Sequence, residues 1–467
     1  MRRIALIAAL LLAVNGAAGA EKTPAAAAKP APAPIDIALH YLRQGELDEA
    51  EARFRRLEND EDEATRTEAR FELGMIAVVR RDYRRAIQIF LDLLATRPGL
   101  ARVRLELARA YFLDENYSDA AFHFQFVMAD KELPEEVRAN VMQYIEAARR
   151  QKSWVVALSF GLAPDTNRNS ASGTSRCIMS VFGPMCDTSG PSHADSGIGL
   201  KLNASVNHYW RWTKNWGLRS TAAAFITKYE GRDYDDNTLY GASGPRYIFG
   251  DGAGEASVQA TYTKRWLYDE RYSYGPGVRA DTNWTIAKQW AAAAGWSITD
   301  ARYDDEATDA ALRGYTRSYY LMPRYVIDNL SFANLEFGYA RDRPRMEDQR
   351  TRSRTYGAGY FREFSLGFSA GVNASVTNIK YDGLSLFMSD TEEGAAEDWE
   401  SCEGDWFLCY KPRRAKIYAT SLTLNSNKWN WHGLFPSLKY SYITRKSDFK
   451  VYEYDRHRLE MLMNVRF

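Results

Sequence analysis

Apolar and polar residues alternate along much of the chain after residue 153, and residues 198–210 (IGLKLNASVNHYW) show the pattern most clearly. A period of two residues predicts a β-strand with two unlike faces. One face carries the apolar residues and ends in Trp210, whereas the other is small, rich in amides and holds a single charge. This combination is typical of a strand in a transmembrane barrel, with lipid outside, a wet lumen inside and aromatic residues at the interface.

Similar segments continue to the last residue and predict an antiparallel barrel of about fourteen strands. The predicted strands lie near residues 154–163, 198–210, 217–229, 237–249, 254–265, 272–286, 290–303, 311–327, 330–341, 352–362, 365–379, 413–424, 433–446 and 452–467. The charged residues Arg279, Asp281 and Glu336 all fall on the polar faces. A charge on the lipid face at mid-membrane costs roughly 2–4 kcal/mol, so this placement favours a membrane barrel over an ordinary half-buried sheet.

The connections between the predicted strands alternate in length. Short turns such as 251–252 and 328–329 alternate with longer loops such as 165–196 and 382–412. Bacterial barrels have short periplasmic turns and long outer loops, and an even strand count returns the C-terminus to the periplasm. We therefore expect an outer-membrane barrel over residues 153–467.

Residues 35–152 repeat with a period near 34 residues. Leu73, Ala77, Ala86 and Phe90 recur as Leu107, Tyr111, Ala120 and Phe124, and an earlier copy contains Ala50 and Phe54. Small residues where two helices cross, each followed by a bulky residue, resemble the tetratricopeptide repeat (TPR). Three copies and a closing helix at 135–150 predict a short TPR-like α-solenoid, so the expected fold class is an α + β multidomain chain.

Most repeat positions are expected to build the fold, but the inner face of the first helices forms a candidate groove for a client polypeptide. Its predicted residues are Phe71, Met75, Val78, Arg102, Leu105, Arg109 and Phe112. The alternatives for this face are simple solvation or contact with the barrel.

The beginning of the chain predicts export from the cytoplasm. Residues 1–20 combine two arginines, an apolar run and a small-residue cleavage site, as in a signal peptide. Residues 21–34 form an Ala/Pro-rich linker, and no later stretch is long and apolar enough for a membrane-spanning helix. A formal net charge of +1 gives no reason to expect a nucleic-acid partner.

The cysteines and the C-terminus fit this topology. Cys177 with Cys186 and Cys402 with Cys409 predict two local disulfides in long outer loops, because their spacing does not suit a Cys₄ metal site. The final alternating strand contains Met463 and Val465 and ends at Phe467, which resembles the signal read by the barrel-assembly machinery. No arrangement of nucleophile, base or paired acids suggests an enzyme, and neither a cofactor nor a metal is expected.

The whole architecture resembles the Slam family of surface lipoprotein assembly modulators. The most local match is the segment APDTNRN at 163–169, in which Pro164, Asp165, Asn167 and Asn169 fit the family's P-[DS]-x-N-x-N pattern. Turn hydrogen bonds from these side chains would explain the same residues without any family relation.

The resemblance implies an outer-membrane translocator for particular substrate proteins, namely surface lipoproteins or secreted haem- or metal-acquisition proteins. It implies a periplasmic repeat domain that docks clients, a barrel that conducts them and, as a further partner, a periplasmic chaperone. Two alternatives stay open: an exopolysaccharide exporter, or a substrate-specific porin with a periplasmic TPR module.

Overall fold

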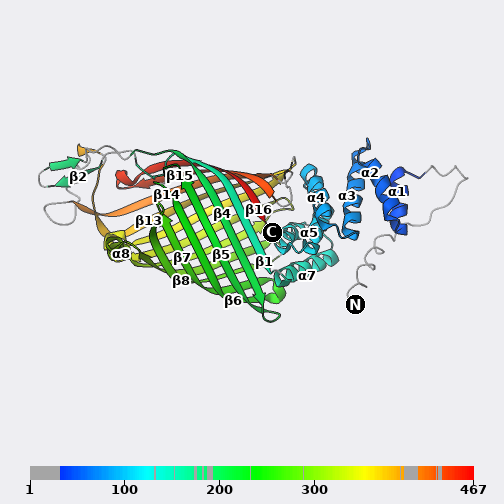
Figure 1. Ribbon diagram of the computed structural model, residues 1–467, viewed down its shortest axis with the longest axis horizontal. Helices are drawn as coiled ribbons and strands as arrows, with labels where there is room; N and C mark the ends of the chain where they lie inside the picture. The colour runs from blue at the N-terminus through cyan, green and yellow to red at the C-terminus, as the bar shows by residue number, and fades with distance from the viewer. Residues whose placement is uncertain are drawn as a thin grey trace, which may run out of the picture.

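The computed structural model describes residues 32–130, 133–151, 153–172, 176–180, 183–186, 193–231, 233–287, 289–365, 367–389, 391–393, 409–426, 429 and 434–466. Helices occupy the N-terminal part and a closed antiparallel barrel the C-terminal part, as the sequence predicts (Figure 1). The predicted signal peptide (1–20) and all but the last residues of the linker (21–34) lie outside the described residues.

Six of the helices form three consecutive antiparallel pairs, followed by a seventh helix. They are α1 (Pro34–Gln44), α2 (Leu47–Leu57), α3 (Glu63–Val79), α4 (Tyr83–Thr96), α5 (Ala101–Leu113), α6 (Tyr117–Met128) and α7 (Glu135–Gln151). The repeated small and bulky positions are the buried ones. Ala50, Phe54, Ala86, Phe90, Ala120 and Phe124 all have 0% exposure.

The repeat also appears in the backbone between the helices of each pair. Gly45, Arg81 and Glu115 each adopt a positive φ, at 81°, 64° and 62°. A left-handed residue at this position ends one helix and lets the chain reverse direction into the next. Asp82 and Asn116 then cap the second helices of their pairs by accepting a hydrogen bond from a backbone N–H three residues on. The helical hairpin is therefore set by local geometry as well as by the buried face.

Fourteen strands close the barrel, and every neighbouring pair is antiparallel, including β1 with β16. They are β1 (Trp154–Asp165), β4 (Gly197–Arg211), β5 (Trp216–Tyr229), β6 (Asp236–Phe249), β7 (Gly254–Leu267), β8 (Glu270–Thr285), β9 (Trp290–Tyr303), β10 (Gly314–Val326), β11 (Ser331–Pro344), β12 (Thr351–Phe364), β13 (Phe368–Leu386), β14 (Tyr410–Ser426), β15 (Leu434–Ser447) and β16 (Tyr454–Arg466). The predicted strands and the alternation of short turns with long loops are confirmed. The largest boundary difference is β13, which runs seven residues beyond its predicted end at 379 through an irregularity between Lys380 and Leu384.

Two long loops contain structure that alternation in the sequence does not reveal. The loop after β1 folds into a small hairpin of β2 (Cys177–Ser180) and β3 (Gly183–Cys186), and the loop after β9 holds the short helix α8 (Glu306–Leu312).

Prolines inside strands lie where a ladder is interrupted. Pro276 falls in a gap of the β8–β9 register and Pro323 in a gap of the β10–β11 register. Proline lacks the N–H that the ladder needs, so both residues are tolerated where a neighbour is not paired.

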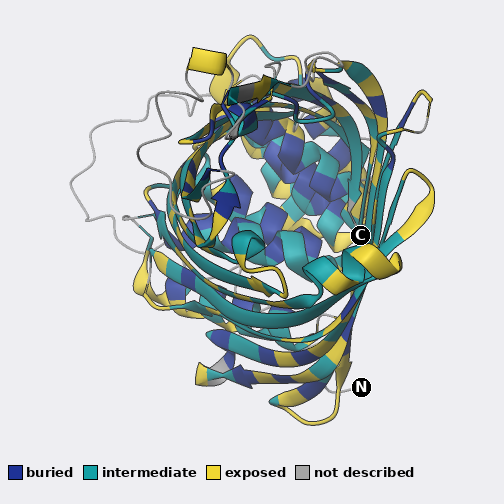
Figure 2. Cartoon of the chain, turned by 90° about the vertical axis from the view of Figure 1, so that its left-hand side faces the viewer, coloured by how far each residue is buried: buried dark blue, intermediate teal, exposed yellow. Residues whose placement is uncertain are grey.

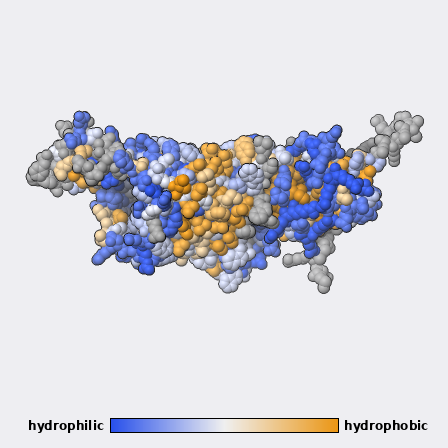
Figure 3. All heavy atoms as spheres, turned by 45° about the horizontal axis from the view of Figure 1, so that its top comes forward, coloured by the Kyte–Doolittle hydropathy of each residue, from blue (hydrophilic) through white to orange (hydrophobic). Residues whose placement is uncertain are grey.

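The outward face of the strands is apolar and exposed, as in Leu200 (61%), Phe337 (42%) and Leu422 (40%). Figure 3 shows an apolar band across the barrel, flanked by hydrophilic surface toward the loops and over the helices. Exposed apolar area of this extent is not stable in water and is covered by lipid. Among the described helices, none is long and apolar enough to span a membrane.

Candidate functional site

The inward face of the barrel is polar and carries paired charges. Asp281 accepts from Arg279 at 3.0 Å and from Arg219 at 3.4 Å, and the Ser257 hydroxyl also donates to it. Glu336 lies three strands away on β11, where it lines a hollow of about 230 Å³ together with Asn334, Asn373 and Lys439. The predicted inward placement of Arg279, Asp281 and Glu336 thus holds. A lumen of this kind suits a hydrated polar or polypeptide cargo better than an apolar one.

The helices sit at the barrel end that carries the short turns, and seen from the loop end they lie across the far opening of the barrel (Figure 2). α5, α6 and α7 make the described contacts with the rim. Arg149 of α7 donates to the carbonyl of Gly252 in the β6–β7 turn, and the Asn329 side chain in the β10–β11 turn donates to the Gly99 carbonyl at 3.0 Å. Because short turns face the periplasm in bacterial barrels, the helical part lies on the periplasmic side.

One ion pair between helix and barrel is almost completely buried. Arg104 of α5 donates to Glu363 of β12 at 2.6 Å, and their side chains are 0% and 8% exposed. Arg104 also donates to the Pro98 carbonyl and lies 3.4 Å from a ring nitrogen of His123. Burial, together with the Arg104 charge, holds the pKa of His123 well below its usual range, so this imidazole is neutral.

Aromatic side chains surround this ion pair and fill the interface. Phe126 of α6 packs on Phe332 of β11 and Phe361 of β12, and Phe122 of α6 also meets the Phe361 ring. Val326 and Ala129 complete the buried cluster. Sequence reasoning missed this site, since Arg104 and Glu363 are 259 positions apart and neither has a local pattern that marks it.

The predicted groove residues fall into two groups. Phe71 is only 3% exposed and belongs to the helical core, with Arg102 stacked over its ring at 4.2 Å. The others lie at the edge of that core. Met75, Val78, Leu105 and Phe112 are partly buried against it, and Arg109 pairs with Glu106 at 2.8 Å. The client-binding role of this face remains a prediction.

The segment at 163–169 ties the end of β1 to β16 and to the first long loop. Asp165 has a fully buried side chain that accepts from Arg456 at 2.6 Å and from Arg458 at 2.8 Å. Asn167 is buried and donates to the carbonyls of Ala171 and Asp455. Asn169 donates to the His193 carbonyl and accepts from the Asp195 amide. Pro164 falls in a gap of the β1–β16 register, which resumes at Asp165.

This motif therefore does more than form a local turn, because two of its side chains reach β16, almost 300 residues later in the chain. It fixes the loop-end of the seam where the first and last strands meet. Further into the lumen, Lys201 of β4 and Glu460 of β16 form a pair at 2.5 Å beside the same seam.

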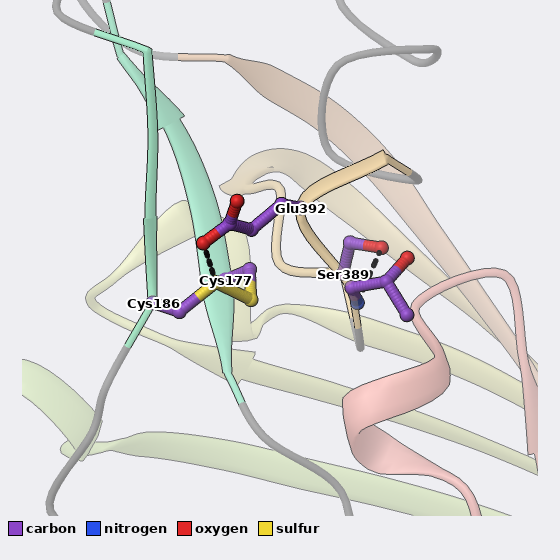
Figure 4. The surroundings of a disulfide bond; sticks show 5 residues. Cys177, Cys186, Ser389 and Glu392 are labelled. Carbon is purple, nitrogen blue, oxygen red and sulfur yellow. Dashed lines mark hydrogen bonds between the residues drawn. A yellow bond between two sulfur atoms is a disulfide. The ribbon is translucent and has the colours of Figure 1, made fainter.

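One of the two predicted disulfides is seen directly. Cys177 and Cys186 are bonded across the β2–β3 hairpin (Figure 4). The backbones of Cys177 and Ser389 exchange two hydrogen bonds, so this hairpin is joined to the loop after β13. Cys409 is also disulfide-bonded, whereas Cys402 lies outside the described residues. Cys177, Cys186 and Cys409 lie at the loop end, as predicted.

Comparison with known proteins decides the family. Residues 154–467 match the family model for the surface lipoprotein assembly modifier. This chain belongs to the surface lipoprotein assembly modifier family. It is similar to surface lipoprotein assembly modifier 2 of Haemophilus influenzae, with 21% identity over 81% of this chain and 73% of that protein. It is also similar to surface lipoprotein assembly modifier 1 of Neisseria meningitidis serogroup B, with 24% identity over 85% of this chain and 76% of that protein.

A third relative carries a different name. The hemophilin secretion modulator of Acinetobacter baumannii is 24% identical, over 85% of this chain and 78% of that protein. Among solved structures, the outer membrane channel DcaP of Acinetobacter baumannii aligns with 68% of this chain and 98% of that chain, at 8% identity and a TM-score of 0.36. Family membership and the closed barrel with its apolar exterior place this family member in the Gram-negative outer membrane.

In this family member, the last strand is paired on both sides. Met463 lies opposite Phe160 of β1 and Pro436 of β15, and Val465 lies opposite Leu158 and Leu434. Phe467 lies outside the described residues, so a role for these three residues as an assembly signal stays a prediction. No group of three or more potential metal ligands occurs within the part of the chain that the structure describes.

Proposed function

We propose that this protein is not an enzyme but a translocator that moves specific substrate proteins from the periplasm to the cell surface. The barrel would be the conduit and the helical repeats its periplasmic docking module. The observation that carries this proposal is the seating of a repeat domain on the periplasmic rim of a polar-lined barrel. A plain solute channel has no need for such a domain.

The names of the relatives support a protein cargo. Several are surface lipoprotein assembly modifiers, and one is a hemophilin secretion modulator. We therefore propose a surface lipoprotein, or a secreted protein that acquires haem or metal, as the substrate. No cofactor enters the proposal. The barrel-assembly machinery and a periplasmic chaperone are the further partners that we propose.

The test is protease accessibility of surface proteins on intact cells, with and without this gene. Loss of one lipoprotein or haem-binding protein from the surface, while it persists in the periplasm, is the expected result and names the substrate. Unchanged surface proteins combined with reduced capsule would point to an exopolysaccharide exporter. Reduced uptake of a small solute would point to a porin.

A further inference from the structure

A row of basic residues crosses the outside of the barrel near its loop end. In the register of five adjacent strands, Arg317 of β10 lies opposite Arg341 of β11, which lies opposite Arg352 of β12. The row continues to Lys380 of β13 and Arg414 of β14. Directly opposite residues have Cβ atoms about 5 Å apart, so five cationic side chains stand side by side.

These side chains point away from the lumen. Arg317 shares its face of β10 with Tyr319 (46% exposed) and Leu321 (42% exposed). Arg352 and Arg414 share theirs with the exposed residues Tyr356 and Tyr418. Since alternate residues of a strand point to the same side, the basic row belongs to the lipid-facing surface.

A second row lies one step closer to the apolar band. Arg354 of β12 is opposite Asn378 of β13, which is opposite Lys416 of β14, and Lys416 is opposite Lys446 of β15. On the other side of Arg354, Tyr339 and Tyr319 continue the row. Tyrosines at this level mark the interface between lipid tails and headgroups. The two rows together, here called the basic belt, thus lie at the headgroup level of the outer leaflet.

Protein carboxylates neutralise only part of this charge. Asp382 lies 2.6 Å from Arg352 and 3.9 Å from Arg341, and Glu453 lies 3.5 Å from Lys446. Within the described residues, no ion pair occurs for the remaining five members of the belt, which are Arg317, Arg354, Lys380, Arg414 and Lys416. Like charges directly opposite each other destabilise a sheet, so this arrangement calls for an external anion.

The belt covers one side of the barrel only. On the other side, Lys228 is neutralised by Asp235 at 2.8 Å and by Asp269, and Lys264 stands alone among apolar neighbours such as Leu239. The outward residues near the loop end of β1 and β4, such as Leu162 and Leu200, are apolar. A general attraction to an anionic membrane surface would not require such asymmetry.

We propose that the basic belt is a binding site for the phosphate groups of a phosphorylated glycolipid of the outer leaflet, that is, lipid A. Arginine presents a planar fork of donors that matches phosphate oxygens, and lysine adds a compact charge. The acyl chains of the lipid would then lie along the apolar band below, against Tyr356, Tyr418 and Leu422. The bound lipid supplies the counter-charge that the strands themselves lack.

The test uses the full chain, purified in detergent and stripped of lipid. Binding of lipid A is compared with binding of dephosphorylated lipid A, phosphatidylethanolamine and inorganic phosphate alone. The test variant carries four substitutions, Arg317→Gln, Arg354→Gln, Lys380→Gln and Lys416→Gln. We expect at least about a tenfold loss of lipid A affinity, since several charge-assisted hydrogen bonds are removed together.

A charge-matched control carries Arg43→Gln, Arg56→Gln, Arg81→Gln and Arg84→Gln on the exposed surface of the helical part and should bind like the parent. Retention of the folded band in an unheated SDS gel shows that each barrel is intact. If the fourfold variant does not fold, the pairs Arg317→Gln with Arg354→Gln, and Lys380→Gln with Lys416→Gln, are tested separately.

Equal lipid A affinity in the belt variant and the control would overturn the proposal. So would equal affinity of the parent for dephosphorylated lipid A. Binding of inorganic phosphate as tight as that of lipid A would assign the belt to a free anion rather than to a lipid.

Discussion

Two buried carboxylates, Asp165 and Glu72, have opposite electrostatic surroundings. Asp165 lies between two arginines and also accepts a hydrogen bond from the backbone N–H of Asn167, so these partners neutralise its negative charge. Glu72 is buried in α3 with Glu68 nearby, and its closest cation, Arg102, is 3.8 Å away and mostly exposed. Burial, and to a smaller extent Glu68, raise the pKa of Glu72 to about 7.

The raised pKa of Glu72 makes the helical part less stable as the pH rises. Between its unfolded value near 4.5 and about 7, the folded chain binds more protons than the unfolded chain, so the free energy of unfolding falls with increasing pH. The full cost, about 3 kcal/mol at 1.36 kcal/mol per pKa unit, is present above pH 7. We expect Glu72→Gln to raise the melting temperature of the helices at pH 8 but not at pH 4, as followed by circular dichroism at 222 nm.

The exposed carboxylate Glu61 provides a control, because Glu61→Gln removes a charge from the same helical part at a position that faces water. A pH dependence that is identical in Glu72→Gln and in the parent would contradict the assignment.

Asp165→Asn should weaken the barrel seam. The substitution leaves the mostly buried Arg456 without its counter-charge, while the partly exposed Arg458 keeps Glu460 at 4.0 Å. The cost should therefore lie below the roughly 3–5 kcal/mol typical of breaking a fully buried pair. The temperature at which the folded band disappears in an SDS gel should fall. Asp195→Asn breaks the more exposed pair with Arg168 and should cost less than about 1 kcal/mol. Equal effects of the two substitutions would refute a special role of Asp165.

At the scale of elements, helices α5, α6 and α7 meet the rim of the barrel in one interface, and its polar centre is the pair Arg104–Glu363. Arg104 lies over the Phe126 ring and 3.4 Å from a ring nitrogen of the neutral His123. Water has little access to it, so each partner depends strongly on the other.

Removing one partner of the Arg104–Glu363 pair should weaken the docking of the helical part on the barrel. In Glu363→Gln, Arg104 keeps its buried charge without an anion, and the docked state loses several kcal/mol. In Arg104→Met combined with Glu363→Gln, no charge remains buried, and docking should recover in part. The expected result is a higher and noisier conductance of the Glu363→Gln protein in planar bilayers, with the double variant closer to the parent. A conductance unchanged in both would show that the helices do not obstruct the lumen.

At the scale of the whole molecule, the helical part and the barrel shield their apolar side chains from water in different ways. The helices enclose two buried clusters of their own, whereas the barrel is closed by backbone hydrogen bonds and has lipid outside. Each part should therefore fold without the other.

Deletion of residues 35–152 tests this division. The barrel should still fold and insert, because all its strand pairs lie within 154–466. Substrate display on the cell surface should be lost, because the proposed docking module is absent. The measurement is protease accessibility of the substrate, with heat modifiability of the barrel as a check. Full display by the truncated protein would remove the docking role.

The sequence by itself determined the class of every major element. The period of two residues identified the strands because side chains alternate between the two faces of a strand. The period of 34 residues identified the helix pairs because each repeat is one such pair. Loop lengths identified the two ends of the barrel, because the spacing between successive strands is also read directly from the sequence. The motif residues Pro164, Asp165, Asn167 and Asn169 were also found, although only as a turn and a family resemblance.

Only the tertiary structure decided what these elements bring together. Barrel closure places Asp165 beside Arg456, and docking of α5 places Arg104 on Glu363. Strand register aligns Arg317 with Arg341 and its neighbours into the basic belt. None of these contacts has a sequence period, since each depends on the stagger of strands and on the packing of rigid units. A shift by one residue would turn each of these strand side chains to the other face.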